Sequence, residues 1–213
     1  MTQMGAIPPV ARIAIGTPIF SPYLEIPVLA EFGLDIVDIR MDSHADWQFP
    51  AAELAKLDDP AVKIFCLVNP SNPPSTKMSD ATLVQLADFV ANTRPDLFIV
   101  TDDVYGTFAD DFVSIFAKCA RNTLCVYSFS KFFGATGWRL GVIALHDDNV
   151  FDAALAHNPR HRKSALIHAT PRSPPNRAIF ASSIVWSPTA EQSRSIIPPA
   201  CPAHSNCKWP CSP

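Results

Sequence analysis

Short apolar segments alternate with amphipathic segments along the first 152 residues of the chain. The apolar segments have the length of strands, and several are apolar throughout; they cover residues 12–16, 35–39, 62–68, 97–101, 123–128 and 139–145. The clearest amphipathic segment begins at Ser79, a residue suited to cap a helix, and ends at Arg94. Its apolar residues follow a helical period at Leu83, Leu86, Ala87 and Val90. This alternation predicts an α/β fold with a mostly parallel sheet flanked by helices on both faces.

The composition changes abruptly after residue 152. Residues 1–152 hold all 7 glycines and carry 10 basic against 19 acidic side chains, whereas residues 153–213 carry 7 basic side chains and one acidic side chain, Glu191. The second segment also contains 10 prolines and 9 serines. Because proline lacks a backbone donor and interrupts helices and central strands, we expect 1–152 to form the folded domain and 153–213 to be disordered or out of frame. A genuine proline-rich extension is the alternative, although no regular P-x-x-P array supports it.

Charge and hydropathy exclude several classes of partner. The net charge is -3, which gives no field that would hold nucleic acid or an anionic membrane surface. No apolar run approaches the roughly 20 residues that a spanning helix needs, and no basic segment precedes an apolar one at the N-terminus. We therefore expect a cytoplasmic protein.

Cysteine placement agrees with this expectation. Cys66 and Cys125 lie within apolar, strand-like runs and Cys119 ends a helix-like run, which is typical of buried free thiols rather than disulfides. Near the C-terminus, the spacing C-x2-H-x2-C-x3-C does not match the established zinc patterns and is interrupted by prolines; its residues are Cys201, His204, Cys207 and Cys211. We expect no metal site.

Polar clusters follow three of the predicted strands. They are Asn69-Pro-Ser-Asn-Pro-Pro74, Asp102-Asp-Val-Tyr105 and Ser128-Phe-Ser-Lys131, and Arg139 comes eight residues after Lys131. Ligands of parallel sheets bind outside the carboxyl ends of the strands, where these clusters are expected. Taken singly, each has an ordinary explanation as a turn, a helix cap or a solvated lysine. Their order and spacing together indicate a binding site.

In these motifs the chain resembles the aspartate aminotransferase fold, whose members (fold-type I) use pyridoxal 5'-phosphate (PLP). The family shows an Asn-Pro turn, then Asp-x-x-Tyr, then Ser-x-x-Lys, then an arginine. Four segments are most similar in sequence to the aspartate 4-decarboxylase branch; they cover residues 15–23, 65–75, 101–111 and 127–142. Pro74 stands where ordinary aminotransferases usually have the threonine of an Asn-Pro-Thr-Gly turn. The resemblance covers about residues 10–152 and implies part of a PLP-binding large domain.

The resemblance implies a role for each residue of the motifs. Lys131 would be the catalytic residue, because its amine both attaches the cofactor and moves protons. Asp102 would keep the pyridine nitrogen protonated, and Asn72 and Tyr105 would donate hydrogen bonds to the ring hydroxylate. The phosphate would be held by the guanidinium and hydroxyl groups of Arg139, Ser128 and Ser130. Phe20 would lie against the face of the ring, although an apolar core position explains it equally well.

By the same resemblance the expected activity is PLP-dependent decarboxylation of L-aspartate at C4, giving L-alanine and carbon dioxide, with aminotransferase activity on the side. The alternatives are an ordinary aspartate-type aminotransferase and a non-catalytic fragment or regulator. No basic DNA-binding module of the kind a regulator would carry is visible. The family also implies a homo-oligomer. Because the resemblance spans only part of such an enzyme, we expect the 213-residue chain alone to be inactive.

Overall fold

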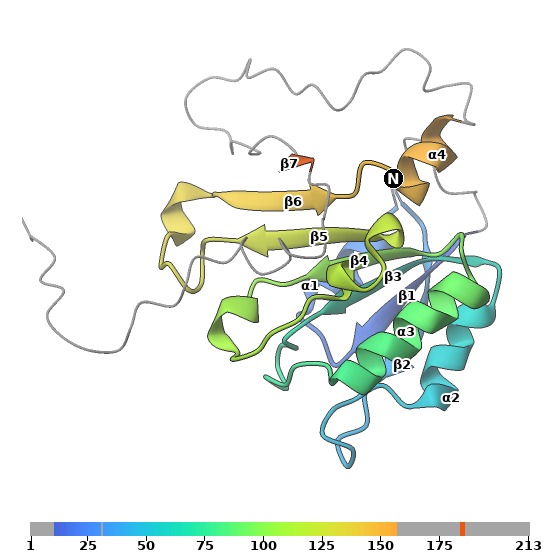
Figure 1. Ribbon diagram of the computed structural model, residues 1–213, viewed down its shortest axis with the longest axis horizontal. Coiled ribbons are helices and arrows are strands. Elements are labelled where there is room, and N and C mark those ends of the chain that lie inside the picture. The colour runs from blue at the N-terminus through green and yellow to red at the C-terminus, as the bar shows by residue number, and fades with distance from the viewer. Residues whose placement is uncertain (1–10, 31, 157–183, 186–213) are drawn as a thin grey trace, which may run out of the picture.

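The computed structural model describes residues 11–30, 32–156 and 184–185 (Figure 1). In this part of the chain, seven strands form one sheet in the order β2-β1-β3-β4-β5-β6-β7. All neighbouring strands run parallel except β5 and β6, which are antiparallel. The strands are β1 (Arg12–Thr17), β2 (Asp35–Arg40), β3 (Val62–Val68), β4 (Phe98–Asp102), β5 (Thr123–Ser128), β6 (Gly141–Leu145) and β7 (Ile184–Val185). The predicted mostly parallel sheet is confirmed.

Among the described residues, four α-helices and several single-turn 3-10 helices connect these strands. The α-helices are α1 (Pro22–Glu25), α2 (Ala51–Leu54), α3 (Asp80–Asn92) and α4 (Val150–Ala156). The 3-10 helices are η2 (Ile26–Val28), η3 (Ala55–Asp58), η4 (Gly106–Phe108), η5 (Ile115–Ala117), η6 (Ala120–Asn122) and η7 (Thr136–Trp138). The predicted helix over 79–94 is α3, and the Ser79 hydroxyl accepts a hydrogen bond from the Thr82 amide at 3.1 Å, which caps its first turn.

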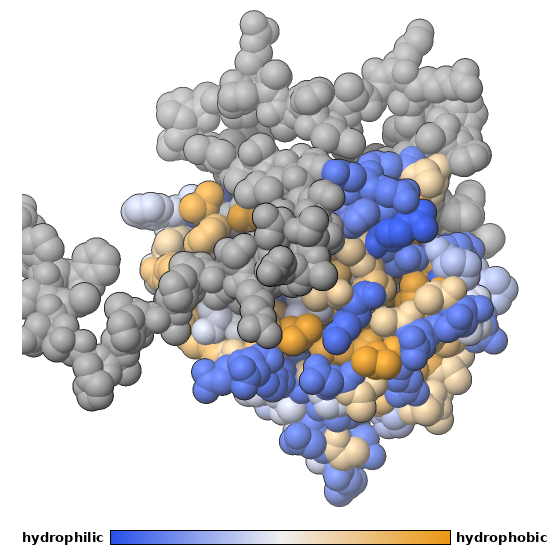
Figure 2. All heavy atoms as spheres, viewed as in Figure 1, coloured by the Kyte–Doolittle hydropathy of each residue, from blue (hydrophilic) through white to orange (hydrophobic). Residues whose placement is uncertain are grey.

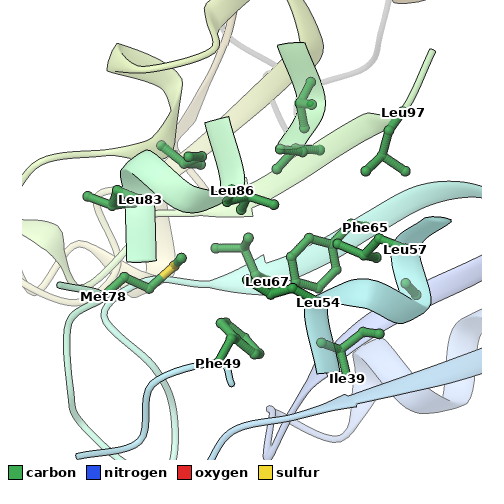
Figure 3. Close-up of a cluster of buried hydrophobic side chains, with 14 of the residues drawn as sticks. Ile39, Phe49, Leu54, Leu57, Phe65, Leu67, Met78, Leu83, Leu86 and Leu97 are labelled. Carbon is green, nitrogen blue, oxygen red and sulfur yellow. The ribbon is translucent and has the colours of Figure 1, made fainter. Parts of the chain in front are cut away.

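Alternate residues of the strands face opposite sides of the sheet, and each side has its own apolar cluster. On one side Phe65 and Leu67 of β3 pack with α2, η3 and α3, as Figure 3 shows. On the other side Ile64 and Cys66 pack with side chains from α1 and α4. The sheet is therefore covered on both faces, which explains why β3 is apolar along its whole length.

A buried arginine joins the C-terminal end of α3 to the loop before β3. Arg94 donates to the carbonyl oxygens of Leu57, Asp59 and Val62 at 2.5, 2.7 and 2.7 Å. Its guanidinium also pairs with Asp96, and this contact holds the pKa of that carboxyl far below its ordinary value. Satisfaction of the donors is what allows a charged side chain to be only 6% exposed.

The structure differs from the sequence-based prediction at the start of β6. The strand begins at Gly141 rather than Arg139, because Arg139 has a φ of 51° and closes η7 in the left-handed conformation, which no strand residue adopts. At the predicted domain boundary, α4 runs through residue 152 to Ala156. Apart from residues 153–156 and 184–185, the predicted tail lies outside the described residues, as do the four C-terminal cysteine and histidine positions.

The outer face over α2 and α3 mixes hydrophilic and hydrophobic residues, and the loop between β2 and α2 is mainly hydrophilic (Figure 2). Within the described residues, no helix is long and apolar enough to cross a membrane. In the same residues no group of three or more histidine, cysteine, aspartate or glutamate side chains is arranged to hold a metal ion.

Candidate active site

The carboxyl ends of β3 and β4 meet at one edge of the sheet. Val68 lies beside Asp102 in the parallel register, and the Asn69 amide donates to the Asp102 carbonyl oxygen at 3.0 Å. The segments that follow these strands converge, and Asn72 Nδ2 donates to the Tyr105 hydroxyl at 3.3 Å. The structure therefore brings together two residues that lie 33 positions apart in the sequence.

Asp102 ends β4 and lies in a partly buried environment. Its Oδ2 accepts a hydrogen bond from the Tyr23 hydroxyl at 2.7 Å, and its Oδ1 accepts one from the Val104 amide at 3.1 Å. Burial raises the pKa of Asp102 above its ordinary value, and these two hydrogen bonds partly offset that effect. The result is a carboxylate held in a fixed orientation by two donors from different parts of the chain.

Tyr23 is the residue of this site that the sequence analysis missed. It lies at the start of α1, and its pKa is raised far above the ordinary value, first by burial and then by the charge of Asp102. The hydroxyl is therefore protonated and acts as a donor throughout the neutral range. One signal could have found it, since Tyr23 ends the Ile15–Tyr23 string that carries part of the family resemblance.

Ser128, Ser130 and Lys131 follow one another at the end of β5. The Ser128 hydroxyl donates to Ser130 Oγ at 2.9 Å, and the Ser130 amide donates back to Ser128 Oγ at 3.2 Å. The loop is fixed further by Thr136, whose hydroxyl donates to the Ser130 carbonyl at 2.8 Å. Lys131 is exposed, and its ammonium group makes no hydrogen bond or ion pair with another described residue.

Two predicted residues lie apart from these groups. Arg139 is exposed, and its Nη1 donates to the Thr136 carbonyl at 3.2 Å rather than to Ser128 or Ser130. Phe20 is 55% exposed and precedes α1. Its exposure argues against the core position that the sequence left open for it.

Comparison with known proteins decides the family. The family model described as aminotransferase class I and II matches residues 1–185, which is most of the chain. The chain belongs to the aminotransferase class I and II family. A protein from Pseudomonas sp, named bifunctional aspartate aminotransferase and L-aspartate beta-decarboxylase, is 61% identical over 157 residues, which cover 74% of this chain and 30% of that protein. The aspartate aminotransferase of Pyrococcus abyssi (strain GE5 / Orsay) is 30% identical over 138 residues, which cover 62% of this chain and 34% of the relative.

Solved aminotransferases share the fold. The aromatic aminotransferase from Pyrococcus horikoshii OT3 aligns with 72% of this chain at a TM-score of 0.59 and 27% sequence identity, and the alignment covers 41% of that structure. The aspartate aminotransferase of Thermotoga maritima aligns at a TM-score of 0.60 with 22% identity, over 72% of this chain and 40% of that structure. The chain thus spans about a third of the curated aminotransferase relatives that it matches.

Proposed function

We propose that this chain is the cofactor-binding part of a PLP-dependent enzyme that decarboxylates L-aspartate at C4 to L-alanine and carbon dioxide and also carries out transamination. The observation that carries the proposal is that Asp102, Asn72 and Tyr105 lie at one edge of the sheet, in a chain that is 61% identical over 157 residues to a protein named for both activities. An ordinary aspartate aminotransferase is the second candidate, because the relative's name includes that activity too.

The donor set around Asp102 fits the pyridine nitrogen of PLP. A carboxylate has about four lone-pair sites, and the bonds from Tyr23 and Val104 use two of them. An acceptor site is therefore free for a pyridinium N–H. Because burial has already raised the pKa of Asp102, a positive partner would also relieve the cost of its ionisation.

The Asn72–Tyr105 pair fits an anionic ring oxygen. Asn72 Nδ2 carries two protons and gives one to Tyr105, and the Tyr105 hydroxyl proton is free to turn toward a ligand. Two convergent donors stabilise an oxyanion and lower the proton affinity of a neighbouring nitrogen.

The phosphate end of the cofactor fits the hydroxyl pair of Ser128 and Ser130, which lies at the end of β5. Arg139 has five N–H donors and uses one of them on the Thr136 carbonyl, so four remain to bind a phosphate. We assign these three residues to the phosphate and Phe20, with its exposed ring, to the ring face.

We assign the catalytic role to Lys131. When bound, PLP supplies an electron sink that stabilises the negative charge left on a substrate carbon when one of its bonds breaks. The exposed Lys131 side chain is free to attach the cofactor through its unprotonated amine, and that amine would then move a proton between substrate carbon atoms. The orientation of Asp102 by Tyr23 sustains the positive ring that this sink requires.

We further propose a homo-oligomer in the cytoplasm. Cys66, Cys119 and Cys125 are free thiols, which supports a reducing compartment. No nucleic-acid or membrane partner is proposed.

Attachment of the cofactor tests the lysine assignment. The chain is incubated with PLP and reduced with borohydride, and the labelled peptide is identified by mass spectrometry. We expect the label on Lys131, and label on Lys118 or Lys77 would refute the site map. Replacing Lys131 by alanine should remove the label, whereas replacing the exposed Lys118 should leave it.

The reaction is tested in a chimera, because the chain spans only part of its relatives. Residues 12–156 replace the aligned segment of the Pseudomonas relative, and the product is supplied with L-aspartate and PLP. We expect carbon dioxide and alanine to form faster than oxaloacetate forms in the presence of a keto acid. Faster formation of oxaloacetate would favour the aminotransferase alternative.

A further inference from the structure

A second carboxylate lies directly after Asp102 and has no part in the proposed chemistry. Asp103 is 5% exposed, so it is far more deeply enclosed than most acidic side chains. Thr101 lies beside Cys125 in the register of β4 and β5, and the Asp103 side chain contacts both. Asp102 contacts Tyr23 of α1, whose ring packs with the apolar cluster that contains Ile64 and Cys66. The two adjacent carboxylates therefore belong to different faces of the sheet.

The Asp103 side chain accepts hydrogen bonds from two neighbouring strands. Its Oδ1 accepts from the Thr101 hydroxyl of β4 at 2.6 Å, and its Oδ2 accepts from the Cys125 thiol of β5 at 3.3 Å. The Ser114 side chain, which precedes η5 and accepts from the Phe116 amide, also lowers the pKa of this carboxylate. Such a buried carboxylate holds its surroundings in one arrangement, because any displacement leaves a charge without partners.

The backbone of the same residue fixes the turn that follows β4. The Asp103 amide donates to the Val126 carbonyl of β5 at 2.8 Å, and the Asp103 carbonyl accepts from the Gly106 amide at 2.9 Å. Asp102 lies immediately before this residue and Tyr105 two positions after it. Contacts that centre on Asp103 thus help to join the segment that holds Asp102 and Tyr105 to β5, in addition to the pairing of Asp102 with Val126.

We infer that Asp103 is a positioning residue that sets Asp102 and Tyr105 against the end of β5, where Lys131 follows. This inference rests on the proposed function, since it concerns the residues assigned to the cofactor. Asp103 touches neither substrate nor cofactor and acts through its two neighbours.

The charges around Asp103 agree with this role. Burial raises its pKa to about 6, the bonds from Ser114, Thr101 and Cys125 lower it, and the charge of Asp102 raises it slightly. The pKa of the Cys125 thiol is raised well above its ordinary value, first by burial and then by Asp103, so the thiol stays protonated and remains a donor. At neutral pH the network is therefore a carboxylate surrounded by donors.

The test compares three variants of the whole chain. Asp103→Ala removes the network, Asp103→Asn keeps the volume and one acceptor oxygen, and Asp110→Asn changes an exposed acid nearby as the matched control. The first readout needs no cofactor: it is the Cζ resonance of each of the 3 tyrosines in protein labelled with carbon-13 tyrosine. We expect the resonances of Tyr23 and Tyr105 to shift in Asp103→Ala, to shift less in Asp103→Asn and to stay in place in Asp110→Asn.

The second readout is the PLP concentration that gives half-maximal borohydride labelling of Lys131. We expect it to rise about tenfold in Asp103→Ala, because about 1.4 kcal/mol of orientation is a factor of ten in binding. If Asp103→Ala does not fold, Asp103→Asn carries the comparison. Unchanged tyrosine resonances in a folded Asp103 variant would overturn the positioning role, whatever the labelling shows. Absence of labelling in the unmodified chain would instead refute the proposed function, and the tyrosine resonances would still decide the role of Asp103.

Discussion

Replacing Tyr23 by phenylalanine removes one hydroxyl and leaves the ring in place. The hydroxyl donates to Asp102 Oδ2 at 2.7 Å, and the tyrosine ring packs against an apolar cluster that phenylalanine preserves. A hydrogen bond to a charged group contributes about 1.5–3 kcal/mol to stability, compared with about 0.5–1.5 kcal/mol between neutral groups. We expect Tyr23→Phe to lower the free energy of unfolding by about 1.5–3 kcal/mol at pH 8, where more of Asp102 is ionised than in acid.

The stability lost in Tyr23→Phe should be smaller at acidic pH. The pKa of Asp102 is raised above 3.8 by burial, so the stabilisation from this group is fully present below pH 3.8 and is lost as the pH rises through its folded-state pKa. Without the Tyr23 donor that pKa rises further, so the decline in stability with rising pH extends to a higher pH and becomes larger. At pH 3.5 the carboxyl is protonated in both proteins, and the difference should fall to about 0.5–1.5 kcal/mol.

Urea unfolding at pH 8 and pH 3.5 measures both differences, and Tyr127→Phe is the matched control. The Tyr127 hydroxyl pairs with the neutral Thr107 hydroxyl at 3.3 Å, so its removal should cost less than about 1 kcal/mol at either pH. An equal loss for Tyr23→Phe at the two pH values would refute the claim that the tyrosine acts on an ionised Asp102. The same result would remove the support that Tyr23 gives to the proposed cofactor site.

Three further predictions concern the scaffold. Arg94→Lys should lower the free energy of unfolding by about 3–5 kcal/mol in a urea titration, because one ammonium cannot replace a guanidinium that donates to three carbonyls. A variant as stable as the unmodified chain would contradict this prediction. Gly16→Ala should lower the free energy of unfolding by about 1–3 kcal/mol in the same assay, because the added Cβ would lie 2.6 Å from the Phe49 ring. The control Gly137→Ala meets no atom within 4 Å and should leave stability nearly unchanged. Equal effects of the two substitutions would argue against close packing at Gly16. Because the pKa of Asp103 is raised to about 6, this group stabilises the fold fully below pH 3.8 and loses that contribution as the pH rises through 6. Asp103→Asn should therefore flatten the decline in unfolding free energy between pH 4 and 8 by up to about 3 kcal/mol. An unchanged slope would show that the carboxyl does not titrate in this range.

The strands and the longest helix could be predicted from the sequence because their signal is local. The buried faces of β3 and α3 are recorded in the identity and period of neighbouring residues, and the predicted bounds agree with the structure to within two residues. The left-handed Arg139 could not be predicted in this way. Its φ depends on how η7 closes, and arginine has no local preference for that conformation.

The candidate site was predictable only where residues follow a strand. Asn72, Asp102 and Ser128 stand at or just after strand ends, and topology alone places such residues at one edge. Tyr23 reaches Asp102 across 79 positions of sequence, and no period or spacing records that contact. Asp103 has the same chemistry as Asp102, and only the register of β4 and β5 assigns the two carboxylates to different surroundings.

The antiparallel pairing of β5 and β6 has a mechanical consequence. Ser128 lies beside Gly141 in this pairing, so the chain that leaves β5 returns to the same end of the sheet within a short connection (Figure 1). Ser130, Lys131 and Arg139 all lie on that connection, whereas Asp102 belongs to the neighbouring parallel pair. A molecule anchored at both places would tie the hairpin to the parallel part of the sheet. Slower amide hydrogen exchange along the β4–β5 seam would report that tie directly.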